Sequence, residues 1–596
     1  MKPERRLVDL RAALKRRSLT GLLVPRADEH LNEYIPASAD RLRWLTGFTG
    51  SAGLAIVLAE RAAMFTDGRY QLQVRAEVDA ARFEIRHAIE EPAEAWLAEA
   101  LRPGDRLGFD PWLHAEEGVA KLRRAVEGAG AALVPVEPNP VDEVWTDRPA
   151  PPASQVAPHP AVFSGEESSA KRARIAEAVA KAGASAAVLT APESIAWLLN
   201  IRGDDVPYNP VALAFAILRG DGQVSLFLDP ARIDPATRAH LGNGVAIEPR
   251  AALAPALDRL GAAHEVVLVD PRTAPVWFAD RLRSAGARLL AESDPVALPK
   301  ATKNTVEQAG ARAAHRRDAV AVCRFLAWLD REGPTGALTE MEAAERLLAL
   351  RAEGERFRGE SFPAITGSGP NGAIIHYRAT AASDRRIVSG DIYLSDSGAQ
   401  YLDGTTDVTR TVLIGDPPAD VEEIRDRFTR VLKGHIAIAT LRWPRGVAGP
   451  HVEAMARRAL WDVGLDYDHG TGHGVGSYLS VHEGPAGLSR AARPIALAPG
   501  MILSNEPGFY APGRWGIRLE NLVLVVEAPF EGAAKPFLGF ETLTLAPFDR
   551  RLIAPALLSP AERSWLDAYH ARVVHEVGPL LDPAERMWLA AACRPL

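Results

Sequence analysis

The chain has 596 residues, of which 47% are hydrophobic and 24% charged, and its formal net charge at pH 7 is −7. This length exceeds what one hydrophobic core supports and predicts three or four domains, while the composition is typical of a folded globular protein. An acidic balance without a long basic run argues against nucleic acid as a partner.

Other features of the sequence bear on where the protein works. Its two cysteines, Cys323 and Cys593, are too few for a disulfide framework. The N-terminal segment is charged and lacks the apolar core of a signal peptide. No stretch approaches the roughly 18 uninterrupted apolar residues of a membrane helix. We therefore expect a cytoplasmic protein without a membrane partner.

Two α/β domains are predicted before residue 302, at 1–150 and 157–302. In the first, apolar strand patterns alternate with helical patterns, as α/β architecture requires. The second loosely repeats this order: 186–189 corresponds to 22–25, 197–203 to 44–50, and 225–229 to 64–67. The correspondence indicates two copies of one fold.

A third domain is predicted at 303–545, followed by a tail at 546–596. Asn304 with Glu307, and Thr339 with Glu342, form capping-box patterns that open two helices. Strand patterns follow, so we expect an α+β domain with helices packed behind a curved antiparallel sheet. The tail adds an amphipathic helix at about 560–574.

Two aspartates lie in a predicted hairpin at the centre of the third domain. The apolar run 392–394 leads to Asp396, a turn pattern follows at 403–404, and the β-favouring run 405–413 carries Asp407. Side chains alternate faces along a strand, so positions 396 and 407 fall on the same face of such a hairpin. Both carboxylates are therefore expected to point into one site.

Further candidate ligands follow this hairpin along the chain. His469 and His473 lie in a run that is too rich in glycine to be helical. Glu506 follows an apolar run, and 516–521 predicts a strand in which Arg518 and Glu520 share one face. The predicted metal ligands are Asp396, Asp407, His473, Glu506 and Glu520.

The charge of this ligand set favours two metal ions over one. Four carboxylates carry about four negative charges, which two divalent ions neutralise, whereas one ion leaves costly uncompensated charge in a buried site. Carboxylate-rich sites with a single imidazole suit hard or borderline ions, and Mn²⁺ is the expected one. Paired ions of this kind support hydrolysis of a carbonyl substrate.

The order Asp, Asp, His, Glu, Glu resembles that of the dinuclear pita-bread metallopeptidases. Four longer stretches are similar to the three-domain, cytosolic-type Xaa-Pro aminopeptidases: 361–377, 396–411, 469–485 and 505–510. The resemblance spans almost the whole chain. It implies two tandem creatinase-like α/β domains, a pita-bread catalytic domain, and a C-terminal extension that contributes to a homodimer.

The resemblance also implies an activity, namely release of the first residue from peptides with a free N-terminus and proline second. A hydroxide bridging the two ions would attack the carbonyl, and Glu506 would move a proton to the leaving nitrogen. His376 and His482 would stabilise the developing oxyanion, and His473 and Glu506 would also contact the substrate. General peptidases handle this bond badly, because proline lacks the amide N–H and restricts φ.

Three residues are assigned supporting roles. Arg69 matches a family segment that contributes to substrate binding, although it could instead hold Asp67 or a neighbouring loop. His469 and Arg518 would hold the metal ligands in place without binding the metal, with Arg518 orienting Glu520, although His469 could instead be merely structural. An ordinary salt bridge is the alternative for Arg518.

Three alternative functions compete with this hypothesis. A prolidase would use the same five ligands and cut only Xaa-Pro dipeptides. A non-catalytic pita-bread binding protein, or a metal-free creatinase-type amidinohydrolase, would typically have lost ligands that this chain keeps.

Overall fold

The computed structural model describes residues 3–596, with side chains from residue 5 onward. The chain forms two compact units. The N-terminal unit comprises Met1–Ala161 and Glu166–Ala297, and the C-terminal unit comprises Val162–Gly165 and Leu298–Leu596. Each unit is described by itself below.

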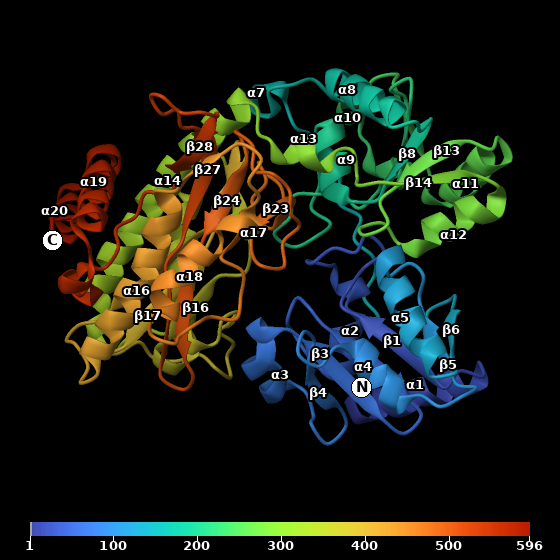
Figure 1. Ribbon diagram of the computed structural model, residues 1–596, viewed down its shortest axis with the longest axis horizontal. Helices are drawn as coiled ribbons and strands as arrows, with labels where there is room; N and C mark the ends of the chain where they lie inside the picture. Colours follow the sequence, from blue (N-terminus) through green and yellow to red (C-terminus); the bar gives the residue numbers. More distant parts are fainter. Residues whose placement is uncertain (1–2) are drawn as a thin grey trace. The chain divides into compact units, whose positions relative to one another are not determined.

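The N-terminal unit contains two six-stranded sheets with equivalent strand orders. The first has the order β4 (Glu84–His87), β3 (Ala62–Thr66), β2 (Leu54–Leu58), β1 (Gly21–Pro25), β5 (Arg106–Phe109) and β6 (Ala132–Pro135). The second has the order β12 (Val245–Glu248), β11 (Val224–Phe227), β10 (Phe215–Arg219), β8 (Ala186–Leu189), β13 (Val266–Val269) and β14 (Arg288–Ala291). Figure 1 labels β1 and β3 to β6 in the first sheet and β8, β13 and β14 in the second.

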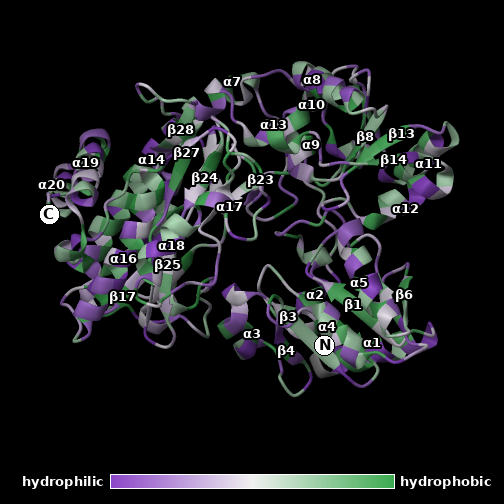
Figure 2. Ribbon diagram, viewed as in Figure 1, coloured by the Kyte–Doolittle hydropathy of each residue, from purple (hydrophilic) through white to green (hydrophobic). Residues whose placement is uncertain are grey.

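Strand pairing confirms the predicted internal repeat. The central strands β1 and β8 each pair antiparallel with one neighbour, β2 or β10, and parallel with the other, β5 or β13. The corresponding segments 64–67 and 225–229 fall on β3 and β11, which take the same position in their sheets. Strand β8 is buried at all four residues, and β8 and β13 are coloured as hydrophobic in Figure 2.

Amphipathic helices accompany both sheets. Around the first are α1 (Pro3–Arg16), α2 (Arg41–Thr46), α3 (Gln71–Glu77), α4 (Ala93–Ala100) and α5 (Glu116–Gly128). The second is accompanied by α8 (Ser168–Lys181), α9 (Pro192–Leu199), α10 (Pro235–Leu241), α11 (Leu253–Ala262) and α12 (Val276–Ala285). Helix α11 buries Leu253, Leu257 and Leu260, whose spacing places them on one face.

Two helices open the C-terminal unit where the capping boxes predict them. Helix α14 (Thr305–Glu332) begins after Asn304, whose side chain accepts hydrogen bonds from the backbone of 306 and 307. Helix α15 (Glu340–Ala352) begins after Thr339, and both capping boxes are complete. Helices α16 (Val421–Ala439) and α18 (Ala454–Trp461) follow later in the chain and pack against each other.

The β-structure of the C-terminal unit is divided among several sheets. The largest has the order β21 (Arg442–Pro444), β28 (Phe537–Thr542), β27 (Asn521–Glu527), β24 (Ile502–Asn505), β22 (Gly472–Gly474) and β23 (Glu483–Leu488). One three-stranded sheet contains β16 (Ile365–Ser368), β17 (Ile392–Ser397) and β20 (Val408–Leu413). A second contains β15 (Phe357–Glu360), β18 (Ala399–Tyr401) and β19 (Gly404–Thr405). Strands β25 (Gly508–Ala511) and β26 (Trp515–Arg518) form a pair.

The predicted hairpin is present, but it is divided between two sheets. Strand β17 pairs with β20, so that Asp396 lies opposite Thr409, while β18 pairs with β19 around the turn. The prediction of one continuous strand at 516–521 was wrong. It breaks at 519–520 because β26 pairs with β25, whereas β27 pairs with β24 and β28.

The C-terminal tail is packed against the rest of its unit. Helices α19 (Pro560–Val577) and α20 (Pro583–Ala592) contribute Leu566, Tyr569 and Leu589 to a core that also contains residues of α16. Cys323 and Cys593 are both buried free thiols. None of the helices described in residues 3–596 has the length and apolar character that crossing a membrane requires.

Candidate metal centre

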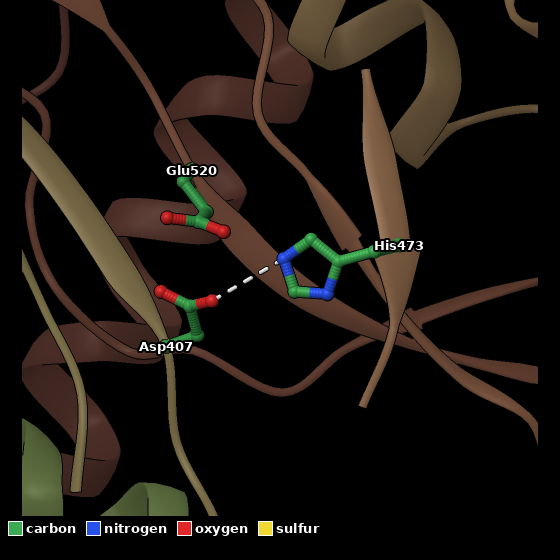
Figure 3. Close-up of side chains that lie close together, drawn as sticks. All are labelled: Asp407, His473 and Glu520. Carbon is green, nitrogen blue, oxygen red and sulfur yellow. Dashed lines mark ion pairs between the residues drawn. The ribbon is translucent and has the colours of Figure 1, made fainter. Parts of the chain in front are cut away.

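Three of the predicted ligands converge at the junction of the sheets. Asp407 lies just before β20, His473 lies in β22, and Glu520 lies in the break between β26 and β27. One potential ligand atom from each lies within 4.8 Å of the others. The three side chains point toward one another in Figure 3, with 3.5 Å between Asp407 Oδ2 and His473 Nε2.

His473 is oriented by contacts with Gly474 and Ser504. Its Nδ1 lies 2.9 Å from the carbonyl oxygen of Gly474, and its backbone N–H donates to Ser504 Oγ at 3.0 Å. A proton on Nδ1, donated to that carbonyl, leaves the lone pair on Nε2, which lies 3.6 Å from Glu506 Oε1 as well as close to Asp407. In this tautomer Nε2 can bind a metal ion.

Asp396, in β17, is a neighbouring charge of Asp407 and Glu520. Arg518 Nη2 donates to Asp396 Oδ2 at 2.7 Å, and both side chains are buried. The second oxygen of Asp396 and one oxygen of Asp407 are buried without a hydrogen-bond partner in the described part of the chain. Such orphaned carboxylate oxygens are costly unless a cation or a donor meets them.

The two glutamates are held by neighbouring hydroxyl groups. Thr409 Oγ1 donates to Glu520 Oε2 at 2.8 Å, and Ser504 Oγ donates to Glu506 Oε1 at 3.1 Å. The backbone N–H of Glu506 donates to the carbonyl of Thr471 at 2.8 Å. These contacts orient each carboxylate and leave it further oxygen lone pairs.

The predicted ligands carry more negative charge than the neighbouring positive groups offset. Burial, together with the neighbouring carboxylates, raises the pKa values of Asp407 and Glu520 well above their ordinary values. Burial also raises the pKa of Glu506, although His473 and Arg518 oppose the shift. Bound divalent cations would lower these pKa values again, because they stabilise the charged carboxylates. The residues present therefore fit a metal centre rich in oxygen ligands.

Arg518 contacts a different carboxylate from the one predicted. Its guanidinium donates to Asp396 rather than Glu520, to Thr409 Oγ1 at 3.3 Å and to the Tyr510 hydroxyl at 2.6 Å. Tyr510 in turn lies 2.9 Å from His469 Nε2. His469 is thus connected to Asp396 through Tyr510 and Arg518.

The two other predicted histidines lie in different environments. The half-buried ring of His482 is 4.3 Å from that of His473, in an edge-to-face arrangement. His376 is half-buried in the segment that follows the 3₁₀ turn Gly369–Ala373. The adjacent Tyr377 donates its hydroxyl hydrogen bond to the buried Glu340 at 2.8 Å, which ties this segment to α15.

Arg69 belongs to the N-terminal unit. Its Nε and Nη2 donate to the two carboxylate oxygens of Asp67 at 2.9 and 2.8 Å, and its Nη1 lies 3.8 Å from Glu33 Oε1. The structure therefore contains the contact with Asp67 that was the alternative to a substrate-binding role. A side chain that holds Asp67 can still offer its remaining N–H groups to a ligand.

Several supporting residues escaped the sequence analysis. Thr409, Arg410 and Tyr510 all contact predicted ligands or their neighbours. The available signal was position, because Thr409 and Arg410 follow Asp407 in the same motif and Tyr510 ends the motif that contains Glu506. Nothing in the local pattern of either motif indicates which distant residue these side chains meet.

Sequence models of four protein families match consecutive parts of the chain. Residues 6–144 and 147–307 match the Creatinase/Prolidase N-terminal domain. Residues 309–527 match metallopeptidase family M24, and residues 536–596 match the C-terminal region of that peptidase family. These matches confirm the predicted tandem creatinase-like domains, the pita-bread metallopeptidase domain and the C-terminal extension.

Individual relatives match along almost the whole chain. A protein of Aspergillus fumigatus named probable Xaa-Pro aminopeptidase P is 41% identical over 584 residues, 96% of this chain and 89% of its own length. Aminopeptidase P2 of Arabidopsis thaliana is 39% identical over 594 residues, 94% of this chain and 83% of its own length.

A solved structure is similar to this chain over its full length. The X-prolyl aminopeptidase of Caenorhabditis elegans, described as a cytosolic enzyme with a di-nuclear active site, superposes with a TM-score of 0.95 at 34% identity and covers 100% of both chains. An Xaa-Pro dipeptidase of Bacillus anthracis shares the fold over 64% of this chain and 99% of its own, with a TM-score of 0.51 and 23% identity. The chain therefore belongs to metallopeptidase family M24, among its Xaa-Pro aminopeptidases.

Proposed function

We propose that the protein is a metal-dependent aminopeptidase that releases the N-terminal residue from peptides with proline in the second position. One observation carries the proposal, namely the convergence of the buried Asp407 and Glu520 with the half-buried His473, beside carboxylate oxygens that lack a hydrogen-bond partner among the described residues. The relatives that match nearly the whole chain are named for this activity. The residues of the site and the relatives that match nearly the whole chain therefore support the same activity.

The metal ligands in this proposal are Asp396, Asp407, His473, Glu506 and Glu520. Two divalent ions held by these residues would supply an activated water-derived nucleophile at neutral pH and polarise the scissile carbonyl. Mn²⁺ is the proposed ion, because four carboxylates and one imidazole form a largely oxygen ligand set. The description of the relative in Caenorhabditis elegans supports two ions through its di-nuclear active site.

The remaining site residues bind the substrate and move its proton. Glu506, whose pKa is raised, would carry a proton to the leaving nitrogen of proline. His482 packs against His473 and, together with His376, would donate hydrogen bonds to the substrate carbonyl oxygen as negative charge develops there. Arg69 would contribute to substrate binding.

Two further properties belong to the proposal. The first is a homodimer with the C-terminal extension at the contact, which is supported by exposed apolar side chains on that extension, Leu580 and Met587. Sedimentation of the Met587→Glu variant beside the unmodified protein tests this contact. The second is a cytoplasmic location, supported by the description of the Caenorhabditis elegans enzyme as cytosolic.

The decisive experiment compares substrates on metal-stripped protein. We expect an Xaa-Pro-Xaa tripeptide to lose its first residue only after Mn²⁺ is added, and the Asp407→Asn variant to remain inactive. Asp462→Asn is the matched control, because it removes an exposed carboxylate just after α18 that pairs with Arg458. Cleavage of an Xaa-Pro dipeptide but not the tripeptide would instead establish a prolidase. Mn²⁺ binding by folded protein without any cleavage would favour a binding role.

A further inference from the structure

A fully buried arginine lies directly behind the metal centre. Arg410 is 2% exposed and occupies β20 one residue after Thr409, whose hydroxyl holds the Glu520 carboxylate. Its Nη1 donates to the carbonyl of Thr409 at 2.8 Å and to the carbonyl of Glu520 at 2.6 Å. The guanidinium thus joins the backbones of the two residues whose side chains make that hydrogen bond.

This connection matters because Glu520 lies outside any regular strand. The chain leaves β26 at Arg518 and enters β27 at Asn521, so Glu520 lies between two sheets. Its backbone N–H donates to the carbonyl of Thr409 at 3.2 Å, and its carbonyl accepts from Arg410. The backbone of a predicted ligand is therefore held by Thr409 and Arg410 instead of by a continuing ladder.

The C-terminal extension supplies most of the remaining contacts of Arg410. Nε donates to the carbonyl of Pro547 at 3.0 Å, and Nη2 donates to the carbonyl of Ala546 at 2.8 Å and to the Tyr569 hydroxyl at 3.0 Å. The guanidinium also lies 4.3 Å from the ring centroid of Phe548. Asn521 Oδ1 accepts a further hydrogen bond from Nη2 at 2.7 Å.

All of these hydrogen-bond acceptors are neutral. A buried guanidinium is costly unless its donors are satisfied, so the position of Arg410 depends on its acceptors. Tyr569 also contacts two of the other acceptors, because its hydroxyl oxygen lies 2.9 Å from the carbonyl oxygen of Ala546 and 3.4 Å from Asn521 Oδ1. The ring of Tyr569 is itself fixed by stacking on Trp565, one turn earlier in α19.

We infer that the C-terminal extension is a working part of the metal centre, in which Tyr569 holds Arg410 and Arg410 holds Glu520 in position for metal binding. Tyr569 and Arg410 are positioning residues in this scheme. The inference rests on the proposed metal centre. It assigns the extension a role within each chain, separate from any contact with a second chain.

The test measures the affinity of the protein for Mn²⁺. Calorimetric titration of metal-stripped protein with Mn²⁺ is compared for the unmodified chain, Tyr569→Phe, Arg410→Lys and the double variant. Loss of a partner that orients a metal ligand typically weakens affinity about 10- to 100-fold, and we expect Tyr569→Phe near the lower end of that range. Because Tyr569 acts through Arg410, we expect the double variant to be no weaker than Arg410→Lys alone.

Tyr401→Phe is the matched control. It removes another buried tyrosine hydroxyl of the same unit, which donates to Asp318 Oδ1 at 3.0 Å. We expect this variant to lose stability while its Mn²⁺ affinity stays within about twofold of the unmodified protein. The comparison separates positioning of the metal ligands from general loosening of the fold.

Three results would overturn the inference. Unchanged affinity in Tyr569→Phe, with Mn²⁺ still binding to the unmodified chain, refutes the role of the extension and leaves the proposed function intact. Equal weakening in Tyr401→Phe attributes the effect to general stability. Absence of Mn²⁺ binding in the unmodified chain removes the metal centre itself, and with it both proposals.

Discussion

A buried ion cluster beside His482 allows a quantitative prediction. Lys300 Nζ lies 2.8 Å from Glu483 Oε2, and Lys303 Nζ lies 2.5 Å from Glu483 Oε1. All three side chains are at most 3% exposed. Although burial favours its neutral form, the two lysines hold the pKa of Glu483 below its ordinary value. The Glu483 carboxylate therefore bridges the two buried lysine side chains, and Glu307 adds a second negative charge that acts on Lys303.

The variants Glu483→Gln and Lys303→Met should differ strongly in stability. Glu483→Gln removes the carboxylate that bridges both buried lysines, and breaking a buried pair in this way costs about 3–5 kcal/mol. Lys303→Met leaves Lys300 and Glu483 as a neutral pair, so we expect less than about half of that loss. Glu483 also follows His482, so Glu483→Gln should lower kcat/KM by roughly tenfold, corresponding to about 1.4 kcal/mol.

Scanning calorimetry of the full chain measures the unfolding of the C-terminal unit. Hydrogen exchange of peptides covering β23 reports whether the loss is local to Glu483. Glutamine keeps the size of glutamate, so a packing defect contributes little to the comparison. If Lys303→Met destabilises the protein as much as Glu483→Gln, or if Glu483→Gln changes nothing, the charge-balance argument is refuted.

Three further predictions concern the metal centre and its surroundings. In metal-free protein the raised pKa values of Asp407 and Glu520 mean that folding favours their protonated forms. Their contribution to stability is complete below the unfolded values of about 4 and is lost as pH rises through the folded values. The increase in melting temperature on adding Mn²⁺ should therefore be larger at pH 8 than at pH 5, and a smaller increase at pH 8 would contradict this. Thr409→Val removes the hydroxyl that orients Glu520 and should weaken Mn²⁺ binding about tenfold by calorimetric titration, whereas Thr409→Ser should restore it. Glu340→Gln disturbs the acceptor of the backbone N–H of Ser368, in the segment that leads to His376. It should lower kcat/KM roughly tenfold and leave Mn²⁺ affinity within about twofold, so a parallel loss of both would refute the separation of the two roles.

Local chemistry allowed much of the fold to be predicted from sequence. The capping boxes at Asn304 and Thr339 involve residues three apart, so the starts of α14 and α15 follow from the sequence alone. The repeated order of strand patterns predicted two equivalent sheets, which the strand orders confirm. The ligand types and their order along the chain pointed to a metallopeptidase before any distance was known.

Only the tertiary structure decided which side chains meet behind the ligands. Alternation along a strand suggested that Arg518 would serve Glu520, but a change of sheet at 519–520 brings Arg518 to Asp396, 122 residues away in the sequence. Tyr569 reaches Arg410 across 159 residues. Periodicity determines the face on which a side chain lies, whereas its partner depends on how distant segments pack, which no local pattern contains.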